Sequence, residues 1–210
     1  MSDKPAYRDL KYAIRSRPAS DYEIKPVEWL WPGRFALGAY SRIDGDPGLG
    51  KSQIAIDMAA RVTRGADWPV DDDAKAEVGS VILISAEDDP ERVIVPRLKA
   101  AGADLGRVHL TGDVFNWNLE GPESTRDLSL ETDANILYDL IHNLHYVRMV
   151  IIDPLNAFLG HTDAHRDSEI RGKILAPLAQ VAQDTNTAII SIGHLNKSSS
   201  KRNKGYAITS

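Results

Sequence analysis

The sequence predicts an α/β fold of three layers, in which a central, mainly parallel sheet is flanked by helices. Three apolar runs that each stop at a polar residue indicate strands buried on both faces, namely "GSVILISAE", "VRMVIID" and "TAIISIGH". Helical patterns separate these runs, and such alternation is typical of parallel strands joined by crossovers. A glycine-rich turn, "GDPGLGKS", joins an earlier strand to a helix.

The N-terminal part divides at about residue 25. Residues 1–25 are polar and mixed in charge, and we expect a loosely ordered lead segment there, with the folded domain over 26–210. In "VEWLWPGRF", Trp29, Leu30 and Trp31 are too apolar for open solvent. We therefore expect this stretch to pack on the domain or on a neighbouring subunit.

The first strand and helix surround the glycine-rich turn. "ALGAYSRIDG" predicts the strand, although "AYSRID" is more polar than a central parallel strand should be. Residues 51–64 predict the helix, whose apolar stripe consists of Ile54, Ala55, Met58, Ala59 and Val62.

A second helix is predicted by "DDPERVIVPRLKAAG", which begins with Asp and Pro and ends at Gly102. Pro96 lies inside it and predicts a kink. The short strand "RVHL" follows, and then a long polar insertion over 111–132, for which we expect a hairpin.

The last two helices are predicted over 133–145 and 169–184. The first has an apolar face, and the second is expected to kink or restart at Pro177. The final strand, "TAIISIGHL", precedes a polar and basic tail.

Composition bounds the functional classes. The chain has 210 residues, 42% of them hydrophobic, which suits one domain with a sizeable core. The net charge of −5 means that contact with DNA or RNA would need a local basic patch, for which the tail "KSSSKRNK" is one candidate. Cysteine is absent, which excludes disulfides and thiolate metal sites. No apolar run approaches the roughly 20 residues that span a bilayer, so we expect a cytoplasmic protein without membrane contact.

The glycine-rich turn matches the pattern G-x-x-x-x-G-K-[ST] as Gly45, Gly50, Lys51 and Ser52. Its glycines allow backbone N–H groups to converge on phosphate oxygens, and the following helix directs its positive end to the same place. Lys51 is predicted to reach the β- and γ-phosphates of ATP, and the Ser52 hydroxyl to ligate Mg²⁺. The predicted nucleotide-binding residues are Gly45, Asp46, Pro47, Gly48, Leu49, Gly50, Lys51, Ser52 and Gln53.

Carboxylates stand where two buried strands end. Asp153 closes "VRMVIID", at the strand edge where open α/β sheets bind ligands, and is predicted to hold the magnesium ion together with Ser52. Glu87 is the first acidic residue after "SVILISA" and is predicted to activate the attacking water. Asp88 would orient a neighbouring group, and Asp89 would cap the next helix before Pro90.

Other polar features carry weaker signals. His194 ends the third apolar run and either senses the γ-phosphate or is satisfied by nearby backbone. His161, Asp163 and His165 have an H-x-D-x-H spacing that is compatible with a metal but more typical of a polar loop. Trp117 would stack on a base or pack against its own loop.

Taken together, these places resemble the RecA-type P-loop ATPases, and most closely the RepA-like branch of hexameric replicative DNA helicases, over about residues 26–200. The resemblance rests on "VEWLWPGRFALG", "GDPGLGKS", "ISAEDDPERVIVPRL", "VIIDPLNAFLG" and "DSEIRGKILAPLAQVAQDTNTAIISIGHLNK" in that order. It implies ATP and Mg²⁺ at the glycine-rich loop, with Glu87, Lys51 and His194 as catalytic residues. It also implies a ring hexamer with ATP between subunits, and single-stranded DNA as a partner.

The family continues with further strands and with arginines that act on a neighbour's ATP, whereas this chain stops at Ser210. The resemblance therefore leaves a truncated domain or a missing trans-acting arginine as the two expectations. A P-loop kinase for a small molecule remains an alternative, although the arginine-rich lid typical of that class is not evident. The other alternative is a nucleotide-binding regulatory module that does not turn ATP over.

Overall fold

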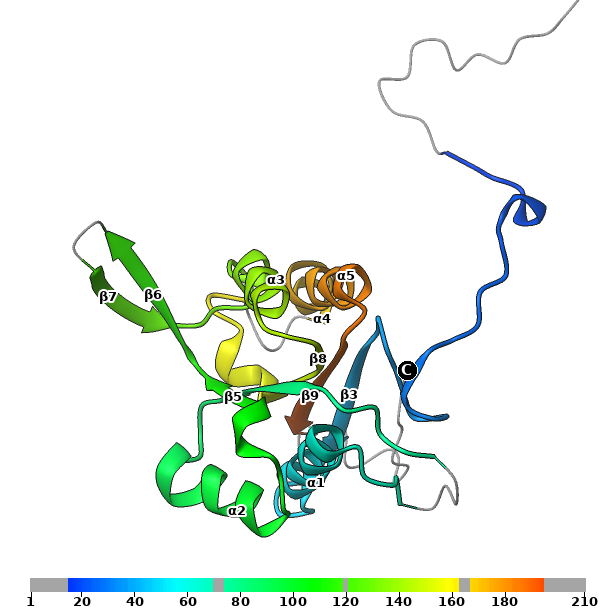
Figure 1. Ribbon diagram of the computed structural model, residues 1–210. Helices are drawn as coiled ribbons and strands as arrows, with labels where there is room; N and C mark the ends of the chain where they lie inside the picture. Colours follow the sequence, from blue (N-terminus) through cyan, green and yellow to red (C-terminus); the bar gives the residue numbers. More distant parts are fainter. Residues whose placement is uncertain (1–14, 70–73, 119–120, 163–166, 195–210) are drawn as a thin grey trace, which may run out of the picture.

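The fold is that of a RecA-like P-loop α/β protein, as the sequence predicts. The computed structural model describes residues 15–69, 74–118, 121–162 and 167–194. Five parallel strands form the central sheet in the order β3-β9-β8-β4-β5 (Figure 1). Their bounds are Tyr40–Gly45 for β3, Ala188–His194 for β9, Val147–Asp153 for β8, Ser80–Ser85 for β4 and Val108–Thr111 for β5.

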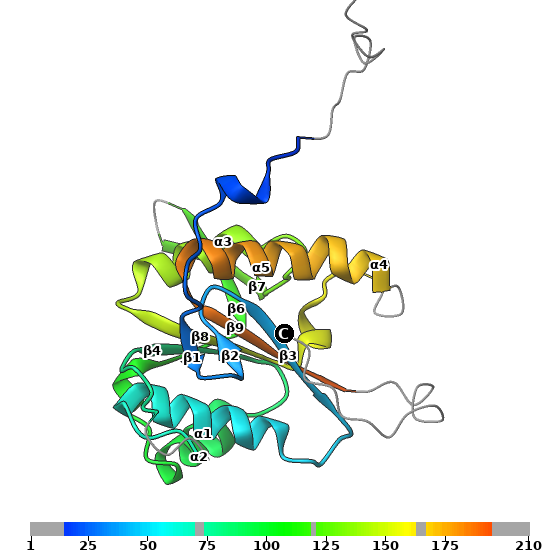
Figure 2. The same ribbon diagram turned by 90° about the vertical axis from the view of Figure 1, so that its right-hand side faces the viewer.

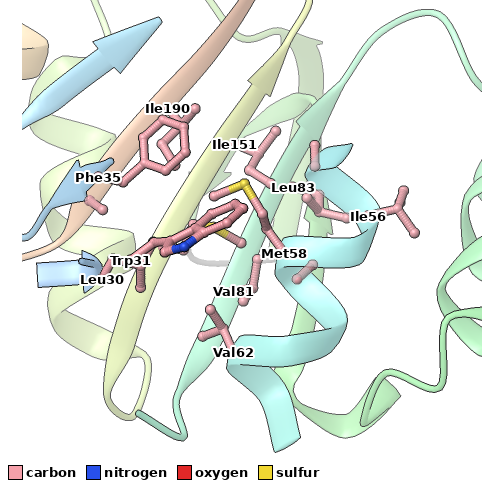
Figure 3. Close-up of a cluster of buried hydrophobic side chains, with 14 of the residues drawn as sticks. Leu30, Trp31, Phe35, Ile56, Met58, Val62, Val81, Leu83, Ile151 and Ile190 are labelled. Atoms are coloured by element: carbon pink, nitrogen blue, oxygen red, sulfur yellow. The ribbon is translucent and has the colours of Figure 1, made fainter. Parts of the chain in front are cut away.

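Helices cover both faces of this sheet and complete the three layers (Figure 1, Figure 2). α1 (Lys51–Arg64) and α2 (Val95–Ala100) lie on one face, and α3 (Ala134–Asn143) and α5 (Ala176–Thr185) lie on the other. Each face has its own apolar core. In the first core, Met58 and Val62 of α1 pack towards the sheet, where Val81 is fully buried (Figure 3).

The tryptophan-rich stretch packs on the domain, which is one of the two places predicted for it. It forms a small antiparallel pair, β1 (Trp29–Trp31) and β2 (Phe35–Ala36). Leu30 and Trp31 are buried in the first core (Figure 3). The Trp31 ring stacks on Trp68, with 4.7 Å between the ring centroids. The Trp29 residue remains 42% exposed. Before it, residues 15–28 carry only a short 3-10 turn, η1 (Ala19–Asp21).

The polar character of β3 has a simple explanation, because β3 is an edge strand of the sheet. Its polar side chains also find partners. The Tyr40 and Ser191 hydroxyls are 2.6 Å apart, and burial raises the pKa of Tyr40. Arg42 donates to the Asp44 carboxylate at 2.9 Å, and both side chains lie on the same side of the strand, two residues apart.

The irregularity predicted at Pro96 and Pro177 takes the form of a widened turn before each proline. The π-helical segment η2 (Pro90–Ile94) runs into α2, and α4 (Asp167–Ile170) continues through a second one, η5 (Arg171–Leu175), into α5. The N–H of Val95 donates to Pro90, and the N–H of Ala176 donates to Arg171, each five residues back. A wide turn relieves the clash that a proline ring makes with the carbonyl four residues earlier.

The polar insertion contains the predicted hairpin, β6 (Asp113–Asn118) paired with β7 (Gly121–Asp127), which projects from the domain on the β5 side (Figure 1). The base of the hairpin is held by Asp133, which is buried. The Asp133 carboxylate accepts two hydrogen bonds from Arg126, at 2.6 and 2.7 Å, and one from the Ser129 N–H. Two short 3-10 turns, η3 (Leu105–Arg107) and η4 (Leu155–Phe158), complete the described elements. None of the helices in the described part is long and apolar enough to cross a membrane.

Candidate functional site

The carboxyl ends of the parallel strands meet at one edge of the sheet, and the predicted site residues lie there. The last residues of β3, β9 and β8 are Gly45, His194 and Asp153, and Glu87 follows β4 by two residues. β8 and β4 are neighbours, with Asp153 opposite Ser85 in the parallel register. Since β3 and β8 are separated only by β9, the glycine-rich loop and the two acidic strand ends are brought close together.

The glycine-rich loop needs glycine at two places. Gly48 and Gly50 both have φ of +81°, in the region that other residues rarely adopt, and Gly50 is the N-cap of α1. A Cβ at either position would meet no atom within 4 Å, so the requirement is conformational rather than one of space. The N-terminus of the 14-residue helix α1 therefore opens directly from the loop, where its N–H groups are available to an anion.

Lys51 is held inside the loop. Only 7% of it is exposed, and its Nζ donates hydrogen bonds to the carbonyl oxygens of Gly45 at 2.8 Å and Asp46 at 2.9 Å. The ammonium group is thus fixed beside the helix N-terminus. Two sources of positive charge, the ammonium and the helix end, converge on one place.

An open cavity of about 480 Å³ connects the loop to the two acidic strand ends. The sequence predicted a role at this site for Pro47, Gly48, Gly50, Lys51, Ser52, Gln53, Glu87 and Asp153, and all of them line the cavity. Of the other predicted loop residues, Gly45 and Asp46 bind Lys51 through their carbonyls, and Leu49 is 53% exposed. The structure brings these residues together, while their catalytic roles remain predictions.

Ser52 and Asp153 form a suitable donor set for magnesium. Both line the large cavity, and both also line a smaller cavity of about 30 Å³. A hydroxyl and a carboxylate are hard oxygen donors, and Mg²⁺ at phosphate sites is bound by one or two protein oxygens with phosphate and water oxygens as the rest. Within the described ranges, no group of three or more His, Asp or Glu side chains gathers into a metal site of its own.

Two further charged residues line the cavity, and the sequence reasoning missed one of them. Arg97 of α2 donates to the Asp88 carboxylate at 2.7 Å, and both side chains face the cavity beside the loop. Asp88 thus orients a neighbouring group, one of the roles considered for it. Arg97 was not identified because it lies nine residues after Asp88, beyond the wide turn of η2 that decides where it points.

Asp89 caps the helical segment that follows it, as predicted. Its carboxylate accepts a hydrogen bond from the Arg92 N–H at 2.7 Å, directly before Pro90. Asp89 does not line the cavity, whereas Glu87 and Asp88, the two acidic residues directly before it, do.

His194 is placed through its backbone. It is the last residue of β9 and lies opposite Gly45 in the register of β3 and β9, next to the start of the loop. Asp163, His165 and the basic tail lie outside the described residues, and so does the side chain of Trp117, so the predictions made for them are not tested. His161 is described, and its N–H donates to Glu131, whose pKa is lowered chiefly by a hydrogen bond from Lys173.

Comparison with known proteins gives one finding. The model of a family described as "AAA domain" matches residues 13–200 of the chain, which is most of its length. No protein of curated function matches the chain.

Proposed function

Because the chain belongs to the AAA domain family of P-loop ATPases, we propose that it hydrolyses ATP to drive movement on, or remodelling of, DNA, as a RepA-like replicative helicase would. The observation that supports hydrolysis most directly is the cavity in which Lys51 and Ser52 face Glu87 and Asp153. Nucleotide binding and an ATPase motor follow from the family itself. The coupling to single-stranded DNA rests on the resemblance of the motifs.

In the proposed reaction, the β- and γ-phosphates lie on the N–H groups of the loop and at the N-terminus of α1. The Lys51 ammonium exchanges its bonds to the loop carbonyls for phosphate oxygens. Arg97 contributes a second positive charge at the cavity. Mg²⁺, held by Ser52 and Asp153, would neutralise charge on the phosphate oxygens.

Glu87 is proposed to act as the general base. Its carboxylate accepts a proton from water, whose oxygen bonds to the γ-phosphorus as the bond to the bridging β,γ-oxygen breaks, giving ADP and phosphate. We assign His194 to a contact with the γ-phosphate, because the end of β9 lies beside the start of the loop. A site of this kind senses whether the γ-phosphate is present. We also infer that several copies assemble, with a ring hexamer as the form that the resemblance favours, in the cytoplasm where ATP and DNA are found.

The experiment is ATP turnover with and without single-stranded DNA, measured with no other phosphate acceptor. We expect turnover that DNA stimulates. Lys51→Ala should lose ATP binding, and Glu87→Gln should retain binding while turnover falls by roughly 100-fold or more, the typical contribution of a general base.

Two outcomes would contradict this proposal. Phosphate transfer that requires a small-molecule acceptor would identify a kinase. ATP binding without turnover, unchanged by Glu87→Gln, would identify a regulatory nucleotide-binding module.

A further inference from the structure

The N-terminal segment Arg15–Glu28, which we call the arm, extends away from the domain beyond its base at Glu28 (Figure 1, Figure 2). Every residue of the arm is exposed. Its apolar side chains are included: Tyr22 is 60% exposed, Ile24 97% and Val27 59%. Apolar residues gathered in one exposed segment typically mark a surface that another molecule covers.

The arm has the pattern of a strand with one covered face. Tyr22, Ile24 and Pro26 alternate with Glu23 and Lys25, and the backbone of Tyr22 is extended, with φ −96° and ψ 133°. Within the described ranges, no arm residue belongs to a strand. In the part of the chain that the structure describes, nothing covers the apolar face of this segment.

The arm is attached to the domain at its base, Glu28, by two hydrogen bonds. The Leu37 N–H donates to the Glu28 carbonyl at 2.9 Å, and the Asn186 side chain donates to the Glu28 carboxylate at 2.8 Å. Within the arm, Arg17 lies over the Tyr22 ring, 4.5 Å from its centroid. The arm thus leaves the domain from a defined place beside β3 (Figure 1).

A groove on the other side of the domain has exposed apolar side chains that no described segment covers. It is about 330 Å³ in volume and lies between the β6–β7 hairpin and α3. Phe115 is 55% exposed there and Ile136 is 43% exposed. The residues that line this hairpin groove are Val114, Phe115, Asn116, Ser124, Arg126 and Ile136. A two-stranded hairpin is only marginally stable unless something packs against it.

The arm and the hairpin groove lie at opposite edges of the sheet. The arm leaves beside β3, and the hairpin projects beyond β5, at the far end of the strand order (Figure 1). Five strands put these edges roughly 19 Å apart, with the hairpin further still. Ile24 lies five residues before Trp29 and reaches at most about 17 Å from it when extended. Ile24 therefore falls short of the groove of its own chain.

We propose that the arm of one copy of this chain lies in the hairpin groove of the next copy, with Tyr22 and Ile24 covering Phe115 and Ile136. The two surfaces are different and lie on opposite sides, so the contact is head-to-tail. Repeated contacts of this kind close into a ring or extend as a filament. The contact rests on the proposed function only in that several copies of the chain assemble.

Cross-linking between introduced cysteines tests the contact, because the chain has no cysteine of its own. Chains carrying Ile24→Cys are mixed with chains carrying Ile136→Cys and oxidised mildly without nucleotide. The matched control mixes Ile24→Cys with Leu105→Cys, an apolar residue that is 40% exposed in η3. We expect the first mixture to give roughly tenfold more reducible covalent dimer than the control mixture. A specific contact holds the two cysteines together, whereas random collision does not.

Three results would overturn the proposal: equal dimer in both mixtures, no dimer in either, or as much dimer from Ile24→Cys chains alone, which indicates a two-fold contact. A second variant, Ile24→Asp, should raise the dissociation constant of assembly by roughly 10- to 100-fold, as expected for a lost buried isoleucine. Sedimentation measures that constant, and an unchanged value contradicts the proposal. ATP turnover is read separately, so failure of the contact is distinguishable from failure of the proposed ATPase.

Discussion

The guanidinium of Arg97 is hydrogen-bonded to the carboxylate of Asp88 at 2.7 Å, and the pair lines the cavity that opens from the glycine-rich loop. Arg97 belongs to α2, and Asp88 lies three residues after the end of β4. The pair places a permanent positive charge beside the region where the phosphates are proposed to bind, and a carboxylate holds it in position.

Arg97→Gln is expected to weaken ATP binding by about tenfold, because one charge-assisted contact near the phosphates is lost. Arg92→Gln is the matched control, since Arg92 pairs with Asp89 in the same helical segment but its side chain is 86% exposed. Titration calorimetry with a slowly hydrolysed ATP analogue measures the affinity of both variants. Equal affinities for the two variants would remove Arg97 from the site.

Gly50→Ala should disable the loop, because Gly50 has φ of +81° and alanine at that angle is strained by roughly 1 to 2 kcal/mol. We expect nucleotide binding to be lost or severely weakened, with a small decrease in melting temperature. Gly172→Ala is the control, since Gly172 lies in η5 with no atom within 4 Å of an added Cβ. That variant should bind ATP normally, and a matching loss in it would contradict the conformational argument.

Asp133 should make stability depend on acid pH. Hydrogen bonds from Arg126 are the main cause that lowers its pKa in the folded protein. Because the folded pKa lies below the unfolded value, the stabilisation is fully present above the unfolded pKa and is lost as the pH falls through the folded pKa. Asp133→Asn should therefore cost about 2 kcal/mol near neutral pH, where a hydrogen-bonded carboxylate is replaced.

Urea unfolding between about pH 7 and pH 3 measures this difference in free energy. The gap between the native chain and Asp133→Asn should narrow on the acid side. Asp67→Asn serves as a control, because the Asp67 side chain is 75% exposed and pairs only loosely with Lys75, at 3.8 Å. A gap that stays constant down to the lowest pH would show that the Asp133 carboxylate does not carry the effect.

Trp31→Ala should destabilise the fold by about 3 to 5 kcal/mol, the usual cost of removing a buried aromatic side chain. Trp31 stacks on Trp68 and packs in the first core. Trp29→Ala, two residues earlier, removes a side chain of the same size from a residue that is 42% exposed. Thermal unfolding should show a clearly smaller decrease for Trp29→Ala, whereas similar decreases would mean that β1 does not anchor the N-terminal segment through Trp31.

The sequence alone determined the class of fold, and it placed most of the candidate site residues at the edge of the sheet where the structure has them. Buried parallel strands must be apolar on both faces, so β4, β8 and β9 are visible as continuous apolar runs, and the residue that ends each run marks the ligand-binding edge. Gly50, Lys51 and Ser52 were predicted from the pattern G-x-x-x-x-G-K-[ST], because the local backbone geometry of a phosphate-binding loop requires that spacing.

The tertiary structure alone decided which side chains meet across distant segments. The polar residues of β3 are explained by its position at the edge of the sheet and by the hydrogen bond between Tyr40 and Ser191. No local sequence pattern predicts the order of strands in a sheet. The pairing of Arg97 with Asp88 depends on how the wide turn of η2 aims the following helix. Local sequence fixes backbone preferences over a few residues, whereas contacts of this kind depend on the packing of the whole domain.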